Sequence, residues 1–217
     1  MGKPLLLAFD TAAPHCAAAL LRGGEIIGSV CEEMAKGQAE RLVPLLQELM
    51  DQAGCDWDAL DAIGVGIGPG NFTGVRLAVA TARGLALSLQ KPAIGVSSLE
   101  SAAFDLPRPL MVLQDARRGA VYAQLFLEGR ARAPYLTTAE DLTALDLPSE
   151  VLLTGSKAVE LAPLLHRPAI APVAPVAAAI AQIAVLQISE PPGRPAPLYL
   201  RAPDAATMRD QVPSLLP

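Results

Sequence analysis

The spacing of apolar residues in the first half of the chain restricts the fold more than any other feature of the sequence. Three short apolar runs of strand character are followed by an amphipathic helix, a fourth strand and a second long helix. In order, these segments are residues 5–9, 17–21, 26–30, 38–53, 62–67 and 72–89. Gly23-Gly24 favours a tight hairpin between the second and third strands. This half therefore predicts an α/β unit with the order βββαβα.

The second half has a weaker pattern. A short strand at 92–96 and a helix capped by Ser97-Ser98 and running to Phe104 precede the Pro-containing segment 106–109, which we interpret as a boundary. Further strands are expected at 110–114, 121–127 and 151–154, and a helix at 174–187. Prolines crowd the chain after Ser189, including Pro191, Pro192, Pro195 and Pro197, and predict an extended tail. We predict two domains, residues 1–106 and a smaller α/β domain over 107–217 that ends in this Pro-rich tail.

Composition and charge exclude several classes of protein. A hydrophobic fraction of 52% with only 4% aromatic residues indicates a core of small aliphatic side chains. The net charge of -5 disfavours unaided binding to tRNA or DNA, so a nucleic acid would need a basic partner. The apolar run that ends at Asp10 is too short for a signal peptide or membrane span, so we expect a cytoplasmic protein. The three cysteines show no CxxC spacing and are expected to be reduced thiols.

A glycine-rich segment joins the fourth predicted strand to the second long helix, and we call residues 68–76 the glycine turn. Its missing Cβ atoms would let a ligand approach the backbone at the positive end of the helix, which suits a phosphate or a partner's carboxylate. The candidate interface residues are Gly68, Pro69, Gly70, Asn71, Phe72, Thr73, Gly74 and Arg76. The segment is neither a Walker loop nor G-x-G-x-x-G. The alternative is a structural turn that packs a helix tightly on a sheet.

Two further polar groups follow predicted strands. Asp10 and Thr11 end the first strand, where a carboxylate can hold a metal-bound water or a nucleotide phosphate, or can simply terminate the strand. Asp115 and Arg117 follow the first strand of the second half in the same way. A pseudo-symmetric cleft between the two domains would explain both pairs.

No motif predicts a catalytic residue or a metal site. The only histidines, His15 and His166, do not form an H-x-x-x-H or H-E-x-x-H pair. There is no G-x-S-x-G elbow, and no serine or cysteine has an evident histidine base. Metal-dependent hydrolysis and serine or cysteine hydrolysis are therefore disfavoured.

Four segments together resemble the TsaB/YeaZ family, also labelled glycoprotease-like or peptidase M22-like. They are LLLAFDTA, GVGIGPGNFTGVRLAVATARGLAL, IGVSSLESAA and LQDARRGAVYAQLF, with Pro197–Arg201 similar to the family's closing segment. The resemblance implies a two-domain actin/Hsp70/sugar-kinase-like (ASKHA, ribonuclease H-like) fold built from βββαβα units. The related TsaD subunit carries a paired-histidine metal site, whereas residues 36–41 here contain no histidine. This difference indicates that the chain is not the catalytic paralogue.

The resemblance also implies a function. The chain would be a noncatalytic scaffold or activator of the complex that transfers threonylcarbamoyl to N6 of the tRNA adenosine adjacent to the anticodon. Its partners would be a TsaD-like catalytic subunit and a TsaE-like ATPase, with a homodimer when alone and tRNA reached only through the complex. It would have no intrinsic cofactor, with ATP or ADP and magnesium as candidates at the complex interface.

Two other functions remain open at the level of sequence. The first is a stand-alone nucleotide-dependent kinase or phosphohydrolase that uses Asp10 and Asp115 to hold magnesium across the cleft. The second and least favoured is an M22-type metallopeptidase. If the glycine turn is a docking surface, Gly70→Val should block complex formation and leave the isolated fold intact, whereas unfolding would indicate a structural turn.

Overall fold

Alternation along β1 (Leu5–Asp10) explains why the first sheet is covered on both faces. Leu5, Leu7 and Phe9 pack into one cluster with the long helices, and Leu6 and Ala8 pack into another on the opposite face. Each of these side chains is buried. A strand that is apolar at every position is therefore a central strand between two helical layers.

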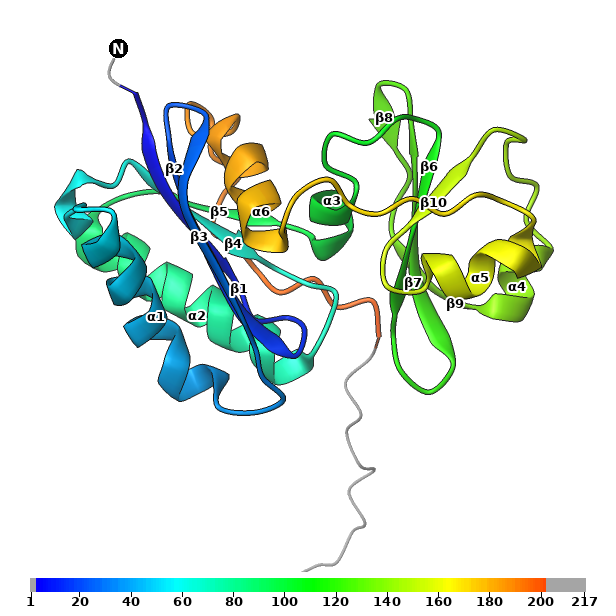
Figure 1. Cartoon of the computed structure of the whole chain (residues 1–217), viewed down its shortest axis with the longest axis horizontal. Helices are drawn as coiled ribbons and strands as arrows, with labels where there is room; N and C mark the ends of the chain where they lie inside the picture. The colour runs from blue at the N-terminus through cyan, green and yellow to red at the C-terminus, as the bar shows by residue number, and fades with distance from the viewer. Residues whose placement is uncertain (1–2, 202–217) are drawn as a thin grey trace, which may run out of the picture.

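The computed structural model describes residues 3–201, which form two lobes side by side (Figure 1). The first sheet has the order β3-β2-β1-β4-β5, with β1 antiparallel to β2 and parallel to β4. The other strands of this sheet are β2 (His15–Arg22), β3 (Glu25–Glu33), β4 (Ala62–Gly66) and β5 (Ala93–Val96).

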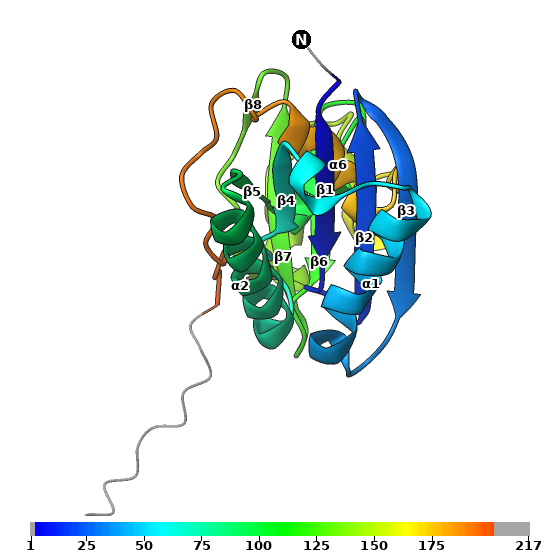
Figure 2. The ribbon, with the colours of Figure 1, turned by 90° about the vertical axis from the view of Figure 1, so that its left-hand side faces the viewer.

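Helices cover the first sheet from both sides. Figure 2 shows α1 (Gln38–Gln52) and α2 (Phe72–Leu89) together on one face, and α6 (Val176–Val185) lies on the other. By length and apolar composition alone α2 could cross a membrane. Its buried residues Val75, Ala78 and Ala82 pack toward the sheet, so one side of this helix belongs to the core of the first lobe. A short 3-10 helix (Trp57–Ala59) precedes β4.

The second sheet repeats part of this plan. β6 (Leu110–Asp115) is antiparallel to β7 (Ala120–Leu127) and parallel to β10 (Leu152–Thr154), as β1 is to β2 and β4. The edge strands β8 (Arg130–Ala131) and β9 (Tyr135–Thr138) both pair with β7. The short helices α4 (Ala139–Thr143) and α5 (Ala158–Leu165) belong to the core on one face. This repetition places Asp10 and Asp115 at corresponding strand ends.

Two helices form the layer between the sheets, α6 on the first and α3 (Ser98–Ala102) on the second (Figure 1). The chain therefore crosses between the lobes twice. Residues 176–185 return to the first sheet, although the predicted division placed them in the domain over 107–217. The reason is that Ile180 and Ala184 complete the apolar face opened by Leu6 and Ala8, a face that α1 and α2 cannot reach.

The predicted order βββαβα is confirmed by β1, β2, β3, α1, β4 and α2. The strands predicted at 110–114, 121–127 and 151–154 are also present, and the Ser97 side chain caps α3 in a capping box with Glu100. β9, α4 and α5 were not predicted, because each is only four to eight residues long and offers too short a stretch for a clear period. The predicted tail contains no helix up to Arg201, and its remainder lies outside the described residues.

Candidate functional site

A cavity of about 1000 Å³ lies between the lobes, where the carboxyl ends of β1 and β6 meet. The first lobe contributes Asp10 and the glycine turn, and the second contributes the end of β6 and the loop after β10. Seven of the predicted site residues line it, and these are Asp10, Pro69, Gly70, Asn71, Phe72, Asp115 and Arg117. Thr11, Gly68, Thr73, Gly74 and Arg76 are not among the residues that line it. The predicted cleft between two corresponding strand ends is thus present.

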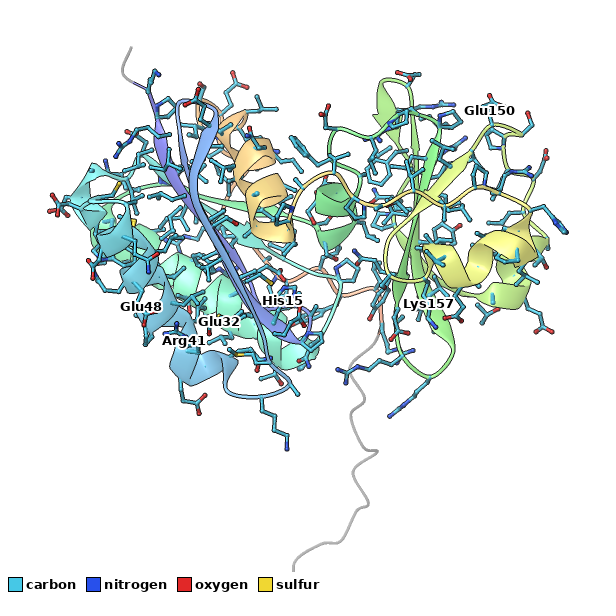
Figure 3. All side chains as sticks on the ribbon, in the orientation of Figure 1. His15, Glu32, Arg41, Glu48, Glu150 and Lys157 are labelled. Carbon is cyan, nitrogen blue, oxygen red and sulfur yellow. The ribbon has the colours of Figure 1, made fainter. Side chains whose placement is uncertain are left out.

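Asp10 forms an ion pair with His15, a residue that no sequence motif assigned to this site. Nε2 of His15 lies 2.8 Å from Oδ1 of Asp10, and the same oxygen accepts a hydrogen bond from the Ala12 N–H at 3.0 Å. Asp10 is only 2% exposed, and its Oδ2 is buried without a hydrogen-bond partner. Figure 3 shows His15 on the first lobe, near the space between the two lobes. Asp10 therefore organises the β1–β2 loop.

The carboxylate also shifts the pKa of His15. Burial of the imidazole lowers its pKa, but the hydrogen bond and charge of Asp10, together with the charge of Glu33, outweigh burial and raise it. The protonated form of His15 is therefore favoured in the folded protein. The pair is a charged contact that strengthens as the pH falls toward the range where histidine is protonated.

The protein's own backbone occupies the space opened by the glycine turn. A Cβ at Gly70 would collide with the carbonyl oxygen of Ala12, and a Cβ at Gly74 with that of Thr11. Asn71 N–H donates to Ala12 O at 2.6 Å, and Thr11 Oγ1 donates to Gly74 O at 2.7 Å. Two glycines and Thr11 therefore serve tight packing of α2 on β1. The expectation that Gly70→Val would leave the fold intact is wrong, because this side chain would meet Ala12.

The side chain of Asn71 caps the first turn of α2. Oδ1 of Asn71 accepts hydrogen bonds from Thr73 N–H at 3.0 Å and Gly74 N–H at 3.1 Å. These are the N–H groups that a phosphate at this helix end would use. Gly68 adopts a positive φ of 84°, and its carbonyl oxygen accepts a hydrogen bond from Ser98 N–H at 2.8 Å.

Arg76 does not reach into the cavity. Its guanidinium lies 3.7 Å from the Phe72 ring centroid, and its Nε donates to the Tyr199 hydroxyl at 2.8 Å. The Phe72 and Tyr199 rings are 5.1 Å apart. Arg83 lies two turns further along the same side of α2, and its Nε likewise donates to Pro195 O. Both arginines fasten the C-terminal segment to α2, and Arg76, a predicted interface residue, does not line the cavity.

The second lobe presents Asp115 and Arg117 on the hairpin between β6 and β7. Oδ1 of Asp115 accepts from the Arg117 N–H at 3.0 Å, and the Asp115 N–H donates to Ser156 Oγ at 2.9 Å. Arg117, Arg118 and Gly119 all have positive φ, at 60°, 52° and 76°. Asp115 thus holds a turn whose exposed arginines adopt a backbone conformation that non-glycine residues seldom use.

The lobes are joined beside the glycine turn by Ser98 and Gln114, which the sequence did not identify. Ser98 Oγ lies 2.8 Å from Pro69 O and 2.9 Å from Gln114 Oε1, and Gln114 Nε2 donates to Ser98 O at 2.9 Å. These groups connect β6 of the second lobe to the segment that opens α2. No local pattern could have revealed them, because serine and glutamine become informative only when their distant partners are known.

The residues of the cavity do not fit a magnesium-nucleotide bound between Asp10 and Asp115. Oδ1 of Asp10 is occupied by His15 and Ala12, and Oδ2 is buried against Gly66. The N–H groups of Thr73 and Gly74 at the start of α2 already donate to the Asn71 side chain. Within residues 3–201, moreover, no three His, Cys, Asp or Glu side chains are grouped as ligands for a metal ion.

Solved structures similar to this chain agree with the two-lobed architecture. YeaZ from Pseudomonas aeruginosa has a TM-score of 0.75 and 29% identity, over 91% of this chain and 100% of that chain. A ROK hexokinase from Thermus thermophilus has a TM-score of 0.55 at 14% identity, over 86% of this chain and 100% of that one. The predicted actin/Hsp70/sugar-kinase-like fold is therefore confirmed.

Sequence comparisons give the family. Residues 24–190 match the family model described as TsaD, tRNA N6-adenosine threonylcarbamoyltransferase. An uncharacterised protein of Mycobacterium tuberculosis is 34% identical over 92% of this chain and 93% of its own length. The tRNA threonylcarbamoyladenosine biosynthesis protein TsaB of Escherichia coli is 35% identical over 54% of this chain and 52% of its own length. With the glycine turn, the paired strand-end aspartates and the two-lobed fold in place, the chain belongs to the TsaB/YeaZ family.

Proposed function

We propose that this chain acts in tRNA threonylcarbamoyladenosine biosynthesis as a noncatalytic subunit that activates a TsaD-like partner. The TsaB proteins of Escherichia coli, Haemophilus influenzae and Bacillus subtilis, which are named for this process, are 34–38% identical to it over 54–60% of its length. The observation that carries the proposal is a long helical face, formed by α1 and α2, that lies exposed on the first lobe.

That face is formed by the outer sides of α1 and α2. Val43 on α1 is 52% exposed and is followed by the exposed Pro44. The outer side of α2 includes exposed Ala80 and Gly84, and a Cβ at Gly84 would have open space around it. Small and apolar side chains on two adjacent helices let a partner's helices approach closely. The face is thus suited to another subunit, or to a second copy when the chain is alone.

A charged network holds α1 in place behind this face. Arg41 donates to Glu32 of β3 and to Glu48 of α1 at 2.6–2.8 Å (Figure 3). Glu32 and Glu48 lie on different elements, so the guanidinium joins the edge of the sheet to the helix. Such bidentate geometry favours one orientation of α1, which a docking surface requires.

The remaining parts of the proposal concern the wider complex. We place a TsaE-like ATPase in the same assembly, and we expect tRNA to reach this chain only there, because its net charge is -5. Any ATP or ADP with magnesium would be held at the interface with a partner, since the cavity fits such a ligand poorly. The site of action would be the cytoplasm, where tRNA is modified.

Reconstitution tests the proposal directly. The cognate catalytic subunit is assayed for threonylcarbamoyl transfer to tRNA with and without this chain, and the mass of the assembly is measured in parallel. We expect little transfer without the chain and a stable assembly with it. Equal transfer in its absence would refute the proposed activation. Transfer or ATP turnover by the isolated chain would instead support a stand-alone enzyme.

A further inference from the structure

The mouth of the cavity carries an aromatic and cationic cluster that the function described so far does not use. We call it the cavity rim, and it consists of Phe72, Arg76, Arg117, Tyr199 and Arg201. All except Arg76 line the cavity directly, and Arg76 contacts both aromatic rings. Phe72 is 39% exposed and Tyr199 44% exposed. Two large rings kept near solvent, each beside an arginine, differ from the aliphatic core of the rest of the protein.

The charge of the cavity rim is opposite to that of the protein as a whole. The carboxylates that line the cavity are Asp10, which is paired with His15, and Asp115. Two arginines, Arg117 and Arg201, therefore line the cavity with one carboxylate that has no histidine partner, and Arg76 adds a third guanidinium beside the two rings. The whole chain, in contrast, has a net charge of -5. A local excess of guanidinium groups in an acidic protein favours a polyanionic ligand at this place.

The backbone at Arg117 and Arg118 gives a second, independent reason. Ala120 N–H donates to Arg117 O at 3.0 Å, and the central residues of this turn, Arg118 and Gly119, both have positive φ, as in a type I′ turn. Arg117 itself also has a positive φ. Asn, Asp and Gly suit such positions, whereas arginine is disfavoured there. The turn would be more stable without arginine, so the guanidinium at 117 is better explained by a ligand than by folding.

We propose that the cavity rim binds a single-stranded segment of RNA, with bases stacked on Phe72 and Tyr199 and phosphates contacted by Arg117 and Arg201. Unpaired bases stack on aromatic side chains and arginine planes, and this combination is typical of single-strand recognition. The inference rests on the proposed function, whose substrate is a tRNA modified next to its anticodon, in an unpaired loop. Because the isolated chain is acidic, binding is expected within the complex with the catalytic subunit.

Paired substitutions in that complex test the inference. The probe is a tRNA transcript that lacks the modification, and the affinity is measured by fluorescence anisotropy at several salt concentrations. Tyr199→Leu should weaken binding about five- to a hundredfold, as expected for loss of one stacked base, whereas Tyr199→Phe keeps the ring and should bind as the wild type does. Arg117→Asn should lower affinity and reduce the slope of log K against log salt by about 0.7, the value for one phosphate contact on a single strand.

Controls separate the outcomes. Arg117→Asn should leave the melting temperature of the chain unchanged or higher, because asparagine suits the turn. Arg130→Asn removes an exposed arginine from β8, outside the cavity lining, and should have no effect on affinity. Two results would overturn the inference. The first is that Tyr199→Leu and Arg117→Asn leave the RNA affinity and the slope of log K against log salt unchanged. The second is that these variants lose subunit assembly but keep normal RNA affinity, which would indicate a protein-docking surface. The proposed function is tested separately, by comparing threonylcarbamoyl transfer with and without the wild-type chain. If transfer does not need the wild-type chain, the proposed function is wrong, and this result does not depend on the variants.

Discussion

The hydroxyl of Thr11 donates a hydrogen bond to the carbonyl of Gly74 at 2.7 Å, across 63 positions of sequence. The contact is buried, and the carbonyl oxygen of Thr11 lies where a Cβ at position 74 would be. The end of β1 and the first turn of α2 are therefore in backbone contact. Glycine at 74 is required by this approach and not by its own backbone dihedral angles, since its φ is not positive.

Gly74→Ala is expected to destabilise the protein by about 1–3 kcal/mol, the range for forcing an extra methyl group into a packed site. Gly84→Ala, on the same helix but with open space around its Cβ, is the matched control. It should raise the free energy of unfolding by about 0.5–1 kcal/mol, because alanine is the better helix former. Urea unfolding of both variants measures the difference, and equal effects would contradict the packing argument.

Asn71→Ala is expected to lower the free energy of unfolding by about 0.5–2 kcal/mol. The substitution removes the oxygen that accepts from Thr73 and Gly74 N–H at the start of α2. Asn71→Asp retains that acceptor and adds a negative charge at the positive helix end, so it should be close to the wild type. A thermal melt of both proteins distinguishes loss of the cap from a general effect of substitution at this site.

The contribution of His15 should depend on pH. The pKa of His15 is raised in the folded state. The pairing of His15 with Asp10 therefore stabilises the protein fully below the unfolded pKa of about 6.5. This stabilisation is lost as the pH rises through the higher pKa of the folded state. His15→Gln should therefore cost more stability at pH 5.5 than at pH 8.5. Urea midpoints at the two pH values measure this, with His166→Gln, at the exposed end of α5, as control. A cost that is the same at both pH values would argue against the ion pair.

Val43→Asp is expected to leave the isolated fold intact and to weaken association with the catalytic subunit at least about tenfold, the effect of about 1.4 kcal/mol in binding. The side chain is exposed on α1, so the charge is solvated in the free chain and desolvated only in a complex. Val159→Asp on α5, where valine is 80% exposed, is the matched control in the second lobe. Light scattering and titration of the two subunits would show the result. Equal weakening by both variants would contradict the assignment of the α1–α2 face.

Much of the first lobe could be predicted because its signals are local. The signals are apolar residues at every second or at every third to fourth position, the cap at Ser97, and the aspartates at the strand ends, Asp10 and Asp115. Each lies within a few positions of the feature that it predicts. The correspondence between those aspartates is also contained in the sequence, since each ends a six-residue strand. The local sequence pattern predicts secondary structure well where the backbone hydrogen bonds join residues that are close in sequence.

The sequence by itself determined the order of elements in the first lobe, the fold class and the family. Only the tertiary structure showed that Thr11 and Ala12 fill the space beside Gly74 and Gly70. It also showed that His15 pairs with Asp10 and that Arg76 stacks on Phe72 and Tyr199. Finally, it showed that α6 returns to the first sheet. Most of these contacts join residues far apart in sequence. The type of an apolar or charged side chain does not identify the distant residue that it contacts. The partner is determined by close packing in the folded protein, after both sheets have formed.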